Sequence, residues 1–364
     1  MASLVTFGEV MARIEPPPPL RFAQALPGPA NVSFAGAEAN VAAAYALLGG
    51  EAAFVTALPQ GPLPDACVAY LRGVGVDVSR ILRRPTGRMG IFFLESGVCQ
   101  RPSTVWYDRA GSTIALLGPD QYDWAKLLAG ARRLHLSGIT PALSAAAAAS
   151  ALACVRHAKA AGLRVSLDLN FRKKLWDWKP GVSARELARS VVGEMLPHVD
   201  LVIGNEEDAE DVLGIKAGAS SVQTGQLDIE RYPDVARQIA ERYPNVSMVA
   251  FTLRESISAT HNNWGAMLWT RATGRGHLAP LRGGRYQPYP ITDIVDRVGG
   301  GDSFAGALLY ALEDPELGKN PDSCVAFATA ASCLCHTIRG DFNFVSRAEV
   351  VALMGGDTSG RVRR

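Results

Sequence analysis

The stretch DRVGGGDSF, residues 296–304, decides the fold class of this chain and points to its chemistry. An apolar run with the composition of a buried helix, AGALLYAL, follows at 305–312. Three consecutive glycines let backbone amides converge just before a helix, whose positive end favours anions. Asp302 places a carboxylate beside them, an arrangement that suits phosphoryl transfer. The alternative is a tight turn capped by Asp302.

Short β-branched or apolar runs alternate with longer alanine-rich segments along the rest of the chain. This alternation predicts strands alternating with helices, and hence an α/β fold with a mostly parallel sheet. The predicted strands lie at 4–10, 52–58, 133–139, 163–170, 199–205 and 246–253. Helices are predicted at 38–49, which ends at two glycines, and in the alanine-rich run 142–162.

Two regions interrupt the alternation, about 11–34 and 87–112. The first contains four consecutive prolines, and the second has two extended segments joined near Gly97. We predict that they form a small sheet that covers the active site and excludes water. The alternative is a surface hairpin without a catalytic role. An inserted loop is predicted at 215–232 and a frayed tail at 356–364, within one domain spanning 1–364.

The composition limits the classes of function. With 48% hydrophobic residues, 20% charged residues and a formal charge of +2, the chain offers no global attraction for nucleic acid. No segment has the roughly 18 apolar residues of a membrane span, and a cytoplasmic enzyme is expected. The six cysteines lack a zinc-binding spacing and are expected to be reduced thiols in the core.

Several motifs in order make the chain resemble the ribokinase-like (PfkB) carbohydrate kinases, and most of all the 2-keto-3-deoxygluconate kinases among them. The motifs that carry this resemblance are FAGAEANVA at 34–42, SGITPAL at 137–143, DLNFRKKLW at 168–176, GNEEDAE at 204–210 and VDRVGGGDSFAGALLYAL at 295–312. The resemblance implies a three-layer sandwich with a mostly parallel central sheet and a small β-sheet lid. It also implies ATP and Mg²⁺ as cofactors.

The resemblance assigns roles to the glycine stretch and to the nucleotide side of the site. Asp302 matches the catalytic base, and Gly299, Gly300 and Gly301 match the anion hole. Asn205 and Asp208 match a motif that organises magnesium, with Asp208 acting through water; a cluster that favours a helix N-terminus is the alternative. The remaining nucleotide-binding candidates are Thr252, Arg254 and Gly340, with Asp341 beside the adenine pocket; a helix cap is the alternative for Gly340 and Asp341.

On the substrate side, arginines are expected because their planar donors match the two oxygens of a carboxylate. The resemblance places Arg109 and Arg172 near an acidic substrate, with Tyr107 as a hydroxyl partner and Gly36 and Asn40 near the sugar hydroxyls. Surface ion pairs are the alternative for the arginines. Arg13 is a further candidate anion contact.

The sequence also departs from the family pattern. Ala35 stands where paired glycines are common, and Arg297 replaces a common threonine, which puts a monovalent-cation site in doubt. Arg254 and Glu255 replace a glycine-containing turn, so the nucleotide preference is less secure than the reaction type.

These observations predict an ATP-dependent kinase that phosphorylates the 6-hydroxyl of 2-keto-3-deoxygluconate. The alternatives are a neutral-sugar kinase, such as a fructokinase or ribokinase, and a non-catalytic sugar-binding regulatory protein of the same fold. A dinucleotide-binding oxidoreductase is disfavoured because no GxGxxG follows the first predicted strand. The predicted partners are small molecules, with no nucleic acid and no membrane, and a homodimer formed through the lid strands.

Overall fold

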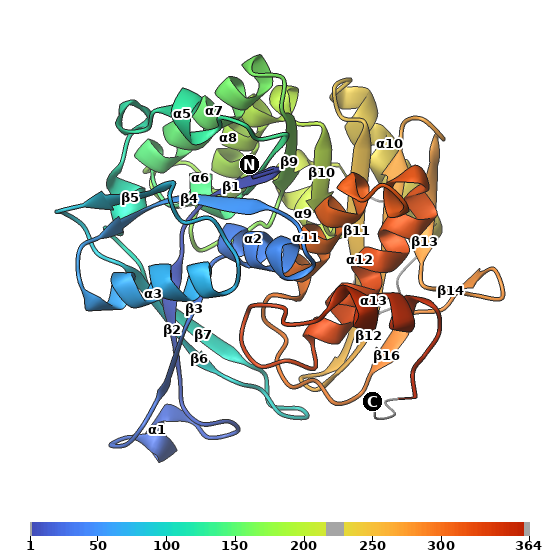
Figure 1. Ribbon diagram of the computed structural model, residues 1–364, viewed down its shortest axis with the longest axis horizontal. Coiled ribbons are helices and arrows are strands. Elements are labelled where there is room, and N and C mark those ends of the chain that lie inside the picture. Colours follow the sequence, from blue (N-terminus) through green and yellow to red (C-terminus); the bar gives the residue numbers. More distant parts are fainter. Residues whose placement is uncertain (1, 216–228, 360–364) are drawn as a thin grey trace.

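The computed structural model describes residues 2–215 and 229–359. A large central sheet lies between two layers of helices, and a smaller sheet extends away from it (Figure 1). The strands of the central sheet, in spatial order, are β13 (Arg275–Ala279), β12 (His261–Thr270), β11 (Met248–Ser258), β10 (Leu201–Gly204), β9 (Arg164–Asp168), β8 (Arg133–Ser137), β1 (Leu4–Phe7), β4 (Ala52–Pro59) and β5 (Ile81–Arg84). A further strand, β16 (Tyr289–Ile291), pairs with β12.

The strands from β11 to β5 run parallel to their neighbours, and the antiparallel pairs lie at the β12 side. Buried side chains alternate between the two faces of β1, with Val5 and Phe7 in one hydrophobic cluster and Leu4 in the other. A parallel sheet that is covered by helices on both faces buries side chains on both of them. The predicted α/β sandwich with a mostly parallel sheet is therefore confirmed, and the predicted strands differ from the observed ones mainly in their ends.

Two sets of helices cover the faces of the central sheet. The helices that pack in the cluster of Val5 and Phe7 are α4 (Thr113–Leu116), α5 (Trp124–Leu127), α6 (Ile139–Ala142), α7 (Ala145–Ala160), α8 (Ala184–Met195) and α10 (Tyr232–Arg242). Those in the cluster of Leu4 are α2 (Ala37–Leu47), α3 (Pro62–Gly73), α11 (Gly300–Glu313), α12 (Pro321–Cys335) and α13 (Arg347–Met354).

Short elements complete the described chain. They are α1 (Phe22–Ala25), α9 (Glu206–Asp208), the 3-10 turns η1 (Pro119–Gln121), η2 (Leu196–His198), η5 (Ile229–Arg231) and η6 (Leu317–Lys319), the π-helical turn η3 (Ala209–Leu213), and the hairpin strands β14 (Leu281–Arg282) and β15 (Arg285–Tyr286). None of the helices within the described ranges has the length and apolar character needed to cross a bilayer.

The smaller sheet has four strands in the order β3 (Asn31–Ala35), β2 (Met11–Glu15), β6 (Gly90–Glu95) and β7 (Thr104–Asp108). Both regions that interrupt the sequence alternation contribute to it, with α1 at the far end in Figure 1. Its inner face buries a small apolar cluster that includes Phe92 and Leu94. Most of the inserted loop predicted at 215–232 lies outside the described residues, as does the end of the tail, 360–364.

Candidate active site

A cleft of about 660 Å³ lies where the small sheet meets the carboxyl ends of β9 and β10. Ligands in open α/β sheets bind outside these strand ends, and the volume suits a small molecule. The cleft is lined by the start of α2, the loops after β9 and β10, the strands β11 and β12, and the glycine turn before α11. It therefore brings together residues from both ends of the chain.

The glycine turn leads directly into α11. Gly299 has φ 81°, and a Cβ there would lie 2.6 Å from the carbonyl oxygen of Asp341, so the turn requires glycine. The helix begins at Gly300, five residues before the apolar run at 305–312, and Ser303 already donates its N–H to the Gly299 carbonyl at 2.8 Å. Asp302 thus belongs to the first helical turn, whose amides have no acceptors within the helix.

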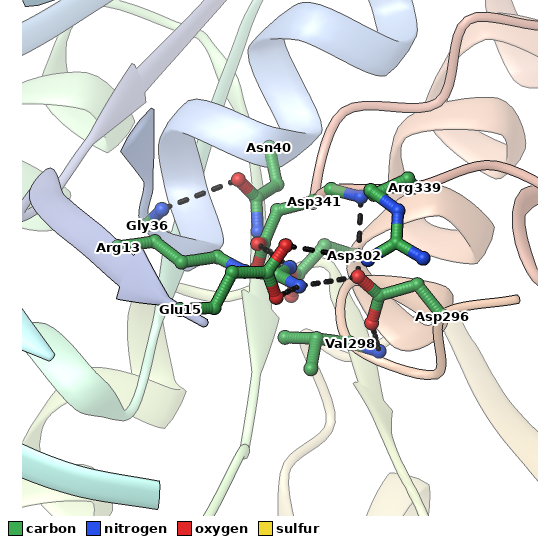
Figure 2. Close-up of polar contacts among 10 residues, drawn as sticks. Arg13, Glu15, Gly36, Asn40, Asp296, Val298, Asp302, Arg339 and Asp341 are labelled. Atoms are coloured by element: carbon green, nitrogen blue, oxygen red, sulfur yellow. Dashed lines mark hydrogen bonds and ion pairs between the residues drawn. The ribbon is translucent and has the colours of Figure 1, made fainter. Parts of the chain in front are cut away.

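The carboxylate of Asp302 is oriented by Asn40 in α2. Figure 2 shows the relay: Gly36 N–H donates to Asn40 Oδ1 at 3.2 Å, and Asn40 Nδ2 donates to Asp302 Oδ2 at 2.7 Å. Burial among protein atoms raises the pKa of Asp302, while Asn40 and the charge of Arg172 oppose that rise. A carboxylate with a raised pKa is a better proton acceptor. A Cβ on Gly36 would lie 2.0 Å from the Glu9 carbonyl oxygen, so this position also requires glycine.

Asp168 and Asp208 add two more carboxylates to the cleft. Burial, together with the charges of Asp208 and Asp302, raises the pKa of Asp168 to about 8. Burial also raises the pKa of Asp208 to about 6, against hydrogen bonds that favour its charged form. Its oxygens accept from the N–H groups of Phe171 (2.9 Å) and Asn205 (3.3 Å), and Asn205 Oδ1 accepts from the Asp208 N–H at 2.8 Å. The side chains of Asn205 and Asp208 therefore cap the turn between these two residues, and both residues also line the cleft.

The two arginines predicted to bind an acid substrate both line the cleft, but their surroundings differ. The guanidinium of Arg109 is buried against the Glu9 carboxylate and lies over the Tyr107 ring, 5.3 Å from its centroid. Arg172 is exposed, and among the described residues it has no ion-pair partner; its charge acts on Asp168, Asp208 and Asp302. Arg172 is consequently the free cation of this pair.

Comparison with known proteins decides the class of this site. The family model described as pfkB family carbohydrate kinase matches residues 1–252 and 278–346. The chain belongs to the pfkB family of carbohydrate kinases. It is therefore a phosphotransferase that acts on a sugar hydroxyl.

Three similar proteins illustrate the range of sugars in this family. The 2-dehydro-3-deoxygalactonokinase of Haloferax volcanii is 30% identical over 99% of this chain and 98% of its own. The crystal structure of 2-dehydro-3-deoxygluconokinase from Thermotoga maritima is 42% identical, with a TM-score of 0.86 over 98% of this chain and 100% of its own. Fructokinase-1 of Oryza sativa is 27% identical over 96% of this chain and 97% of its own.

The structure of this carbohydrate kinase corrects the interpretation of Arg13. Its guanidinium is fully buried, and it donates to Asp341 at 2.7 Å, Glu15 at 2.6 Å and Asp296 at 2.5 Å (Figure 2). Burial opposes its charge, but the three carboxylates raise its pKa overall. Arg13 is thus occupied by protein carboxylates and does not serve as an anion contact in the cleft. Instead it joins the small sheet to the loops on either side of the glycine turn.

Nucleotide-side candidates of the kinase fall into two groups. Asn205, Thr252 and Arg254 line the cleft, together with the glycine turn. Gly340 does not line it in the described part of the chain; its N–H donates to Asp296 Oδ2 at 3.1 Å and supports the network of Arg13.

Sequence reasoning missed several residues that line the cleft. They are Glu9, Asp168, Lys173, Lys174, Trp264 and Arg297. A signal existed for Asp168, because it lies near the end of the strand predicted at 163–170, at the edge of the sheet where ligands bind. The contact of Glu9 with Arg109 joins residues 100 positions apart and has no such local signal.

Proposed function

We propose that this kinase uses Mg²⁺ and ATP to phosphorylate the 6-hydroxyl of 2-keto-3-deoxygluconate. The proposal depends on one observation: Asp302 is held by Asn40 in the first turn of α11, directly after the glycine turn. A hydroxyl within hydrogen-bond reach of Asp302 would give up its proton to that carboxylate as its oxygen attacks the γ-phosphorus of ATP. The bond from that phosphorus to the β,γ-bridging oxygen breaks, and ADP leaves. Backbone amides of residues 299–301 receive the charge on the transferred group.

The carboxylates of the cleft fit a hydrated divalent cation. In the described residues no three acidic, histidine or cysteine side chains form a direct metal cage, but the negative charges of Asp208 and Asp302 raise the pKa of Asp168, and a cation between them would relieve this repulsion. Mg²⁺ keeps several waters and binds through few carboxylates plus substrate phosphates. Asp208 and Asp168 would hold it through water. When bound, it supplies charge neutralisation at the phosphates.

An acidic substrate is supported by the unpaired Arg172. Its planar donors match a carboxylate, and an anion there would neutralise a cation that has no ion-pair partner among residues 2–215 and 229–359. Arg109, held by Glu9, would present its remaining donors from the side of the small sheet, beside Tyr107. The names of the relatives from Haloferax and Thermotoga, both kinases of 2-dehydro-3-deoxy sugar acids, agree with this choice.

The test is a panel of sugars and sugar acids assayed for ATP consumption, with variants at both ends of the cleft. Asp302→Asn is expected to lower kcat by about 10²- to 10⁴-fold with little change in substrate affinity, because only proton acceptance is lost. Arg172→Gln is expected to raise KM for the acid by roughly 10- to 100-fold. Lys179→Gln, an exposed cation outside the cleft, is the control and keeps the wild-type KM.

A neutral-sugar kinase is the second candidate, favoured by the engagement of Arg109 with Glu9 and by the similarity to a fructokinase. Fructose turned over more efficiently than every sugar acid, with KM unchanged in Arg172→Gln, would establish it. A protein that binds sugar and consumes no ATP with any member of the panel would be the regulatory alternative.

We further propose a homodimer through the small sheet. Its edge strands β3 and β7 carry exposed apolar side chains, with Val32 54% and Trp106 50% exposed. Exposed edges of this kind are readily completed by a partner strand. Sedimentation should show a dimer for the wild type and a monomer for Val32→Lys with Trp106→Glu. A wild-type monomer at all concentrations would contradict the proposal.

A further inference from the structure

Two arginines, Arg254 and Arg297, line the cleft beside the glycine turn. In the described ranges no carboxylate lies within ion-pair distance of either guanidinium, although both are close enough to influence each other. Burial lowers the pKa of Arg297, and the charge of Arg254 lowers it further. Two like charges held together in a cleft are unfavourable unless an anion lies between them.

The pairing of β11 with β12 explains why Arg254 stays unpaired. Residues directly opposite each other in an antiparallel pair share a face, and here Arg254 is opposite Trp264. Glu255, the acidic neighbour of Arg254, is opposite Asn263 and accepts from its Nδ2 at 2.9 Å. Since successive residues point to opposite faces, Glu255 lies on the far side of the hairpin and cannot neutralise Arg254.

Arg297 is held against the same face of this hairpin. Its guanidinium donates to Asn262 Oδ1 at 3.1 Å and makes a longer contact of 3.4 Å with Ser256 Oγ. Ser256 and Asn262 are opposite each other and lie two residues from Arg254 and Trp264. The acidic neighbour of Arg297, Asp296, is already engaged by Arg13. The two arginines therefore converge from the hairpin and from the glycine turn.

The same face also has unused hydrogen-bond donors. The indole N–H of Trp264 and the Nδ2 of Asn262 are buried and have no acceptor, and both side chains are less than 5% exposed. Buried donors without acceptors are costly, and a site rich in them is suited to a ligand with many acceptor oxygens. Arg297 already donates to Asn262 Oδ1, so an amide flip would lose that bond.

We propose that Arg254 and Arg297 form a clamp for the polyphosphate chain of the nucleotide, so that this site selects ligands by their phosphate charge. The inference rests on the proposed function, because the clamp lies next to the glycine turn that would receive the transferred phosphoryl group. Arginine donors bind phosphate oxygens in a bidentate way, and two such groups act on a triphosphate more than on a monophosphate. The adenine ring is not required for this recognition.

Calorimetric titration of ATP, ADP, adenosine and inorganic tripolyphosphate tests the clamp in the presence of Mg²⁺. Arg254→Gln and Arg297→Gln are each expected to weaken ATP binding by about tenfold, and the double variant by about 100-fold. Tripolyphosphate should follow ATP, ADP should lose less, and the affinity for adenosine should stay within about twofold. Arg297→Lys should recover part of the loss because it keeps the charge. Arg285→Gln, an exposed arginine in the β14–β15 hairpin outside the cleft, is the matched control.

Unchanged ATP affinity in the double variant would overturn the clamp, as would an equal loss for adenosine, which would indicate general damage to the site. If Arg297→Gln does not fold, the exposed Arg254 still provides the test through its own variant.

Failure of the clamp can be distinguished from failure of the proposed function. A wild type that binds ATP through both arginines but phosphorylates no sugar acid leaves the clamp standing, and a wild type that binds neither ATP nor tripolyphosphate removes both.

Discussion

At the scale of single residues, Glu38 shows how a buried acid can make stability depend on pH. Burial raises its pKa to about 7, although Oε1 accepts from Thr140 Oγ1 at 2.7 Å and from Ser137 Oγ and N–H at 2.8 and 2.9 Å. The other oxygen, Oε2, is buried without a partner. The folded state therefore favours the protonated form more than the unfolded chain does, where the ordinary pKa is about 4.3.

The stability that this protonation contributes is complete below the unfolded pKa and is lost as pH rises through about 7. We predict that the melting temperature of the wild type falls between about pH 5 and 8. Glu38→Gln removes the titration and should flatten this slope, whereas the exposed control Glu316→Gln should keep it. Thermal denaturation across this range measures both slopes, and equal slopes for Glu38→Gln and wild type would contradict the assignment.

At the scale of elements, the turn before α11 has glycines with different requirements. Gly299 combines a left-handed backbone with a close approach to the Asp341 carbonyl, whereas a Cβ on Gly301 would meet nothing within 4 Å. We predict that Gly299→Ala destabilises the fold by about 2 kcal/mol or more through strain and contact. Gly301→Ala should leave stability unchanged or raise it slightly, because alanine favours a helix. Chemical denaturation measures the free energy of unfolding of the two variants. Equal losses of stability would contradict the prediction, because they would show that the backbone moves to make room for a side chain at position 299.

The sequence predicted the helices and strands better than the side-chain contacts that join them. The hydrophobic runs predicted β4 within one residue of its end, since a buried parallel strand is a local pattern. The start of α11 lies before the apolar run at 305–312, because glycines have low helix propensity and a tertiary contact, the hydrogen bond from Ser332 Oγ to the Gly300 carbonyl at 2.6 Å, helps to hold the first turn. The ion pairs of Arg13 and Arg109 were not predicted for a related reason: the carboxylates of Asp341 and Glu9 come from distant parts of the chain, and single-residue patterns do not reveal such pairs.

At the scale of the whole molecule, the small sheet is tied to the rest of the protein at two points. Arg13 connects β2 to Asp296 and Asp341, and at the second point the Ala259 N–H donates to the Cys99 carbonyl at 2.7 Å. The second contact joins the β6–β7 connection to the end of the β11–β12 hairpin. We propose that the small sheet, held at these two points, acts as a cover that excludes water from the phosphates when a substrate is bound.

The cysteines provide a probe of the intact fold and of this cover. Cys99 is exposed, whereas Cys67, Cys154, Cys324 and Cys335 are buried, and burial raises the pKa of each buried thiol. Because the thiolate is the reactive form, an aromatic disulfide reagent should modify one cysteine rapidly in the native protein and all six in denaturant. Cys99→Ser should abolish the rapid phase. ATP with a sugar acid should slow the rapid phase if ligands hold the cover closed at the Ala259 contact. Rapid modification of several thiols in Cys99→Ser would contradict the burial of Cys67, Cys154, Cys324 and Cys335.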